Sequence, residues 1–172
     1  KAGPQTKLLK KQLESMKDGG VVVMAAPDNP SRSPPGPYER ACMIAHYLKT
    51  KKPKSKLIIL DPKKAISKQP VFVEAFNKYY KDIIELKLTN DIDSYKVTKV
   101  DVKAKEVVTK DGAKFKFDVA NIIPNQMAGK LAIDAGANNG DWCPIKLDSF
   151  QSAKLADVYV LGAASVANEM PK

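Results

Sequence analysis

The stretch Val21-Val22-Val23-Met24-Ala25 decides the fold of this chain. An apolar run that is rich in β-branched side chains and uninterrupted by charge is typical of a central parallel strand, buried on both faces. A second run of this kind, Leu57-Ile58-Ile59-Leu60, follows after one intervening helical pattern. Two buried strands joined through a helix predict a β-α-β unit over residues 20–61. The chain is therefore expected to be an α/β protein built on a parallel sheet.

Helical patterns lie on both sides of the first strand. Residues 6–17 carry apolar side chains at helical spacing, with Thr6 as the expected cap. A second helix opens at Tyr38-Glu39-Arg40, with Pro37 in its first turn, where proline is well tolerated. A third helix is predicted from Pro70 to about Lys87, because its aromatic residues fall on adjoining helical rows.

The second half of the chain changes to strand patterns. From Tyr95 the hydrophobic period becomes two, and Asp111-Gly112 between alternating runs is a strong hairpin signal. An antiparallel β-meander is therefore expected. The remaining elements that we predict are a strand at Val119–Ile123, a short helix at Gly129–Ala135 and a last strand at Val158–Leu161.

Composition limits the classes of protein that the chain can be. Its 172 residues include 29 Lys or Arg and 19 Asp or Glu, a formal net charge of +10, and its 44% hydrophobic content excludes a disordered chain. No apolar run approaches the roughly 20 residues that a membrane-spanning helix needs. One domain is the default for this length. The first residue, Lys1, is not an initiator methionine, so the chain is expected to be an internal piece of a longer protein.

The positive charge does not indicate nucleic-acid binding. The lysines are dispersed, and the densest group, from Lys49 to Lys56, lies where a helix should end, a position that favours cations. The only arginines are Arg32 and Arg40, whereas base and phosphate readers favour arginine. We expect no nucleic-acid partner, and an acidic protein partner fits the charge somewhat better.

Cysteine and histidine do not predict a metal centre. Cys42 and Cys143 are too few for a disulfide framework, and neither has a second Cys or His at the spacing of a metal site. His46 follows Cys42 by one helical turn, but two ligands do not make a site. A buried cysteine and a partly exposed histidine are the expected roles.

The loop after the first strand bears on cofactor binding. In an open parallel sheet, ligands collect at the carboxyl ends of the strands. A dinucleotide pyrophosphate needs glycines and free backbone N–H groups there, whereas residues 26–37 contain five prolines and only Gly36. We therefore expect no NAD(P) binding. Asp61, at the end of the second strand, has the position of a ribose-binding acid. We favour the alternative, in which Asp61 belongs to an Asp-Pro turn that ends the strand.

Glu39 is the best-placed candidate for acid/base chemistry in this loop region. It falls in the first turn of its helix, where the dipole stabilises a carboxylate. The pattern is compatible both with a purely structural role of Glu39 at the helix start and with a role in acid/base chemistry.

Several stretches carry a family resemblance. Asp28 to Arg40, with the core Pro-Pro-Gly-Pro-Tyr-Glu-Arg, resembles the flavoprotein subunit of flavocytochrome c sulfide dehydrogenase, a relative of sulfide:quinone reductase and the disulfide-reductase flavoproteins. Later segments of that subunit are similar, in the same order, to residues 122–130, 142–144 and 167–172. The resemblance spans essentially the whole chain.

The resemblance implies a Rossmann-like NAD-domain fold with bordering parts of an FAD domain. Residues 1–18 would border the FAD domain, 19–121 would form the NAD-domain-like unit, and 122–172 would return to the FAD-domain border. It further implies FAD as cofactor, sulfide as substrate, a cytochrome c subunit as partner and a periplasmic location. The family uses no NAD in the second domain, in agreement with the proline-rich loop.

The resemblance also assigns site residues, and two positions depart from the family pattern. Glu39 matches a proposed acid/base near the flavin, and Ser33 stands where the family has a redox cysteine. The residues that would approach the flavin are Pro124, Asn125, Gln126, Gly162, Ala163 and Ala164. Ala163 replaces an aspartate that holds the flavin's ribityl chain. The chain alone is therefore expected to bind no FAD and to be inactive. A non-catalytic paralogue or an interaction module on the same fold is the alternative.

Overall fold

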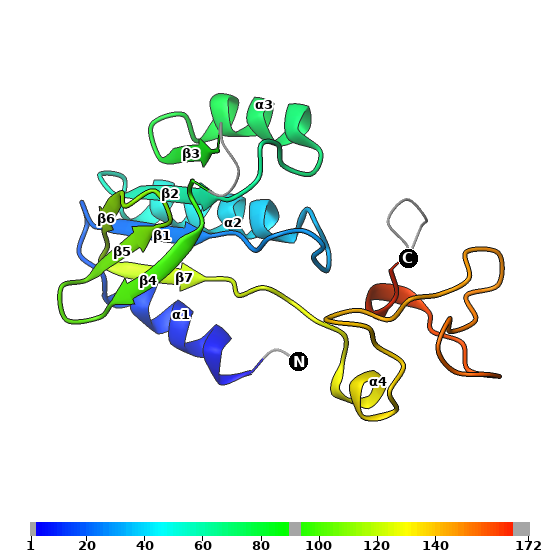
Figure 1. The fold of residues 1–172 in the computed structure, drawn as a ribbon. Coiled ribbons are helices and arrows are strands. Elements are labelled where there is room, and N and C mark those ends of the chain that lie inside the picture. The colour runs from blue at the N-terminus through cyan, green and yellow to red at the C-terminus, as the bar shows by residue number, and fades with distance from the viewer. Residues whose placement is uncertain (1–2, 90–93, 167–172) are drawn as a thin grey trace. The chain divides into compact units, whose positions relative to one another are not determined.

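The structure, a computed structural model, describes residues 3–89 and 94–166 and divides the chain into two compact units (Figure 1). The first unit comprises residues 1–28 and 34–124, and the second comprises residues 29–33 and 125–172. Within the described residues, no helix is both long and apolar enough to cross a lipid bilayer.

A four-stranded sheet in the order β3-β2-β1-β7 forms the centre of the first unit. Its strands are β1 (Val21–Ala25), β2 (Lys56–Asp61), β3 (Ile84–Leu88) and β7 (Val119–Ile122). All three pairings are parallel, and Val23 of β1 lies opposite Ile58 and Ala120. The predicted α/β class and the two central strands are thereby confirmed.

Three helices pack on one face of this sheet. They are α1 (Pro4–Ser15), α2 (Gly36–Lys51) and α3 (Gln69–Tyr79). One core cluster joins buried side chains of all three to Val22 and Met24 of β1, which point to the same face. Thr6 does not cap α1 as predicted, because the helix begins earlier, with Gly3 at the N-cap and Pro4 in the first turn.

The third predicted helix is too long. It ends at Tyr79, and residues 84–88, which were expected to continue it, form strand β3. In this segment partly buried Ile84, Leu86 and Leu88 alternate with other residues and pack against the core. Parallel pairing with β2 satisfies the backbone of the segment, and this tertiary gain outweighs the local helical pattern.

An antiparallel meander covers the opposite face of the sheet. It consists of β4 (Val97–Asp101), β5 (Glu106–Thr109) and β6 (Lys114–Lys116). Val23, Leu60 and Val107 form the buried core between the two sheets. The predicted hairpin at Asp111-Gly112 joins β5 to β6, and Gly112 adopts φ +86°, which suits glycine.

The second unit contains little regular structure. Its described elements are α4 (Lys130–Asp134), close to the predicted short helix, and a single 3-10 turn, η1 (Gly162–Ala164). The strand predicted at Val158–Leu161 is wrong, because Tyr159 forms only an isolated bridge with Gln151. A strand requires a neighbouring ladder, and Tyr159 and Leu161 are instead 61% and 72% exposed. Ala128, Ala137 and Cys143 make the small core of this unit.

Candidate functional site

The carboxyl ends of β1 and β2 are joined by a hydrogen bond from Ala26 N–H to the Leu60 carbonyl, at 2.9 Å. From this point the proline-rich loop leaves the sheet, and α2 begins after the N-cap Pro35. The N–H groups of Tyr38 and Glu39 both donate to the Pro35 carbonyl. Pro37 lies in the first turn of α2, as predicted.

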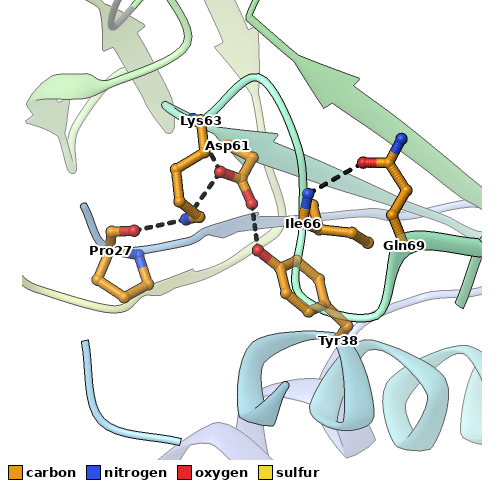
Figure 2. A network of polar contacts seen from close by, with 6 residues as sticks. All are labelled: Pro27, Tyr38, Asp61, Lys63, Ile66 and Gln69. Atoms are coloured by element: carbon orange, nitrogen blue, oxygen red, sulfur yellow. Dashed lines mark hydrogen bonds and ion pairs between the residues drawn. The ribbon is translucent and has the colours of Figure 1, made fainter. Parts of the chain in front are cut away.

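A buried polar network lies where these elements meet (Figure 2). The Tyr38 hydroxyl donates to Asp61 Oδ2 at 2.6 Å, and the backbone N–H of Lys63 donates to Asp61 Oδ1 at 3.0 Å. The Lys63 ammonium lies 2.8 Å from the same Oδ1 and donates to the Pro27 carbonyl at 2.7 Å. One carboxylate thus connects the loop start, α2 and the turn after β2.

The electrostatics of the network keep the Tyr38 hydroxyl as a donor. Burial raises the pKa of Tyr38 far above its ordinary value, and the hydrogen bond to Asp61 and the charge of that carboxylate raise it further. The Asp61 side chain is 0% exposed, and both of its oxygens are occupied by protein donors. Asp61 is therefore a structural acid that ends β2, as the sequence predicts, and its fully buried carboxylate is not accessible to a ribose hydroxyl.

Glu39 and Arg40 face away from this network. Both are exposed and line a cavity of ≈ 710 Å³ between α1 and α2. The Arg40 guanidinium donates to the Asn121 side chain at 3.1 Å, whereas Glu39 lies in the first turn of α2, where the helix dipole favours its charge. The location agrees with both readings of Glu39 that the sequence left open.

Ser33 lies in the part of the proline-rich loop that belongs to the second unit. It is exposed and adopts φ +44°, in the left-handed region that a serine rarely occupies. Its neighbour Arg32 fixes this segment, because its N–H donates to Gln126 Oε1 at 2.6 Å and its guanidinium donates to the Met127 carbonyl at 2.7 Å. The structure thus brings residue 126, one of the predicted flavin contacts, beside the residue that precedes Ser33.

The remaining predicted flavin contacts offer few side-chain donors. Pro124 ends the first unit and exposed Asn125 begins the second part of the second unit. Gly162, Ala163 and Ala164 form the 3-10 turn η1, and Gly162 adopts φ +74°.

The described residues do not fit FAD by themselves. A dinucleotide site needs a glycine-rich phosphate loop, which the sequence lacks. The carbonyl oxygen of the Gln126 side chain is already bonded to Arg32.

The two cysteines are free thiols with raised pKa values. Burial raises the pKa of Cys42, and the nearby charge of Glu39 adds to the effect. Burial also raises the pKa of Cys143. Thiolates are the reactive form, so neither side chain is activated as a nucleophile. Within residues 3–89 and 94–166, no group of three or more His, Cys, Asp or Glu side chains is arranged to hold a metal ion.

Sequence reasoning missed Tyr38 and Lys63 as members of the site. The sequence places Tyr38 at a helix start and within the family string at Pro34–Arg40 but assigns it no role, and it gives no sign of Lys63. The available signal was local for Lys63, because Asp-Pro-Lys places its N–H two residues after a strand-ending Asp, a spacing that favours an Asx turn. No local signal links Tyr38 to Asp61, since they meet only through the packing of α2 on the sheet.

Comparisons with known proteins agree with this architecture. Residues 6–124 match the protein-family model for the central part of the sulfide dehydrogenase (flavocytochrome c) flavoprotein chain. The fold is similar to the crystal structure of reduced Bacillus anthracis CoADR-RHD, with a TM-score of 0.57 and 16% sequence identity. That similarity covers 96% of this chain and 27% of the Bacillus chain, so this chain spans about a quarter of its structural relative.

Proposed function

The chain belongs to the family of sulfide dehydrogenase (flavocytochrome c) flavoprotein chains, and from that membership we propose that it forms the central part of an FAD-dependent sulfide:cytochrome c oxidoreductase subunit. In such a subunit, residues 19–121 are the NAD-domain-like unit, and residues 1–18 and 122–172 border the FAD domain. The description of the matched family as a central region supports this assignment.

The NAD-domain-like unit acts in this proposal without a nicotinamide nucleotide. The observation that carries this step is that buried protein contacts occupy the carboxyl ends of β1 and β2, where a nucleotide would bind. The Asp61 carboxylate is fully buried and bonded to Tyr38 and Lys63, and Pro35 rather than a glycine caps α2. An added ribose would have to displace a charge-assisted hydrogen bond inside the core, which costs more than it returns.

With a redox cysteine in place of Ser33, the same subunit would pass electrons from sulfide to a cytochrome c subunit in the periplasm. Its flavin would be held mainly by chain outside these residues, with the turns at Pro124–Gln126 and Gly162–Ala164 as the edge of the site. Glu39 is exposed beside a cavity, which leaves it free to act as an acid or base toward a bound group.

Two residues favour a second candidate, a non-catalytic paralogue or interaction module on the same fold. Ser33 cannot form the disulfide or persulfide that sulfide oxidation uses, and Ala163 lacks the carboxylate of the family pattern. The leading and second candidates differ in whether the full flavoprotein chain turns over sulfide once a cysteine stands at position 33.

Sulfide-dependent reduction of cytochrome c by the full flavoprotein chain separates the two candidates. The chain is purified with its flavin in three forms: with Ser33, with Ser33→Cys, and with Ser149→Cys as a control at another exposed serine of the second unit. We expect turnover from Ser33→Cys and none from the other two forms. Flavin-loaded Ser33→Cys that reduces no cytochrome c contradicts the oxidoreductase proposal and supports the second candidate.

A further inference from the structure

We propose that Asp61 is a positioning residue that fixes both ends of the proline-rich loop, at Pro27 through Lys63 and at Tyr38 directly. The functional importance of this loop rests on the proposed function, because the loop carries Ser33 and leads into Glu39. The contacts that make the two anchors all lie within the first unit.

The first anchor holds the point at which the loop leaves β1. The Lys63 ammonium bridges Asp61 Oδ1 and the Pro27 carbonyl, at 2.8 Å and 2.7 Å. The Lys63 side chain is only 15% exposed, so water competes weakly for these contacts. The backbone N–H of Lys63 also donates to Asp61, which fixes the lysine from both ends. The carbonyl of Pro27 is thereby held against β2.

The second anchor holds the point at which the loop becomes α2. Tyr38 is 1% exposed, and its ring packs against Phe72 of α3 with centroids 5.5 Å apart. Its hydroxyl reaches Asp61 Oδ2 at 2.6 Å. A side chain that is clamped at both its ring and its hydroxyl fixes the rotation of the first turn of α2. Glu39, the next residue, is therefore directed to the outside.

The residues between the anchors transmit this order. Pro27, Pro30, Pro34, Pro35 and Pro37 restrict φ at five positions within the loop. Because a stiff segment has few conformations to begin with, fixing its two ends orders it at a smaller entropy cost than a flexible segment would require. Figure 2 shows the turn after β2 held in the same way, where the Ile66 N–H donates to Gln69 Oε1 at 3.0 Å. Asp61 is the one side chain in the described network that contacts both anchors.

Limited trypsin digestion of the 172-residue chain measures loop order directly. Trypsin can cut after exposed Arg32 in the loop and after exposed Lys103 in the turn between β4 and β5, which serves as an internal reference. The quantity measured is the ratio of the two initial cleavage rates. A local loss of loop order raises this ratio, whereas a loss of global stability raises both rates together.

We expect Lys63→Met and Tyr38→Phe each to raise the ratio roughly tenfold, as the loss of a charge-assisted hydrogen bond implies. Lys63→Arg, which keeps a cation able to reach both acceptors, returns the ratio to within about twofold of the unaltered chain. Lys87→Met removes a lysine from the exposed pair with Glu85 on β3 and leaves the ratio unchanged.

The proposal is overturned if both Lys63→Met and Tyr38→Phe leave the ratio unchanged, or if both raise the two cleavage rates equally. It is also overturned if Lys63→Arg behaves as Lys63→Met does. The digestion requires neither flavin nor sulfide. Its failure therefore leaves the proposed function standing, and failure of the turnover assay leaves the digestion result standing.

Discussion

The substitution Tyr38→Phe removes one hydroxyl oxygen from the buried network and leaves the aromatic packing in place. The ring keeps its contact with Phe72, and no cavity larger than the hydroxyl forms. The carboxylate loses its donor at Oδ2, whereas Oδ1 keeps the two donors from Lys63. Hydrogen bonds to charged groups contribute about 1.5–3 kcal/mol, so we expect the free energy of unfolding to fall by about 2 kcal/mol.

Guanidinium-induced unfolding, followed by circular dichroism, measures this change as a lower midpoint at an unchanged slope. The matched control is Tyr47→Phe on the same helix. Tyr47 packs partly buried against the same core, and within the described residues its hydroxyl has no hydrogen-bond partner. The control should change the free energy by less than about 0.5 kcal/mol. If Tyr38→Phe is as mild as Tyr47→Phe, the carboxylate does not depend on the tyrosine and the reasoning is refuted.

Three further changes test other parts of the first unit. Lys52 is 8% exposed and donates to carbonyls at the C-terminal end of α1, so Lys52→Met should lower the free energy of unfolding by about 2 kcal/mol, and an unchanged midpoint would contradict this. Gly20→Ala places a Cβ 2.6 Å from Met16 Cγ, and thermal unfolding should report a loss of about 1–3 kcal/mol. The hydrogen bond from the Thr109 hydroxyl is the main cause of a lowered pKa at Asp111, and the Ala113 N–H is a smaller one. The ionised carboxylate therefore stabilises the turn at pH values above the ordinary pKa of aspartate, and this stabilisation is lost as the pH falls through the lowered pKa. NMR titration should find a higher Asp111 pKa in Thr109→Val, and an identical pKa in both chains would exclude the hydroxyl as the cause.

Local pattern was sufficient for the central strands and the hairpin. The runs that became β1 and β2 are apolar and β-branched, so their preference for strand and their burial agree. Asp111-Gly112 predicted its turn because a tight hairpin needs a residue with positive φ, which glycine adopts readily, and Gly112 has φ +86°. In such segments, the local preference and the tertiary environment select the same structure.

The errors occurred where tertiary pairing decides the structure. Residues 84–88 follow a run of aromatic residues at helical spacing, and pairing with β2 turns them into a strand. Residues 158–161 have a strand-like sequence, yet the described chain gives Tyr159 only one isolated bridge. Strand propensity measures the fit to a neighbouring ladder, and a single segment does not carry that information.

The candidate site was predictable in part. The proline-rich loop and the string at Pro34–Arg40 located it, and the structural reading of Asp61 followed from the Asp-Pro turn. The link between Tyr38 and Asp61 joins residues on α2 and β2, so no spacing within either element reveals it. The roles of Ser33 and Glu39 come from the family resemblance and remain predictions.

The flavin content of two purified chains tests the central claim most directly. The 172-residue chain and the full flavoprotein chain that contains it are each incubated with FAD, freed of unbound flavin and examined by visible absorption. The account predicts about one flavin per full chain and no flavin absorbance in the 172-residue chain, because its residues form only the edge of the site. A stoichiometric flavin spectrum from the 172-residue chain, or a full chain without flavin, would contradict it.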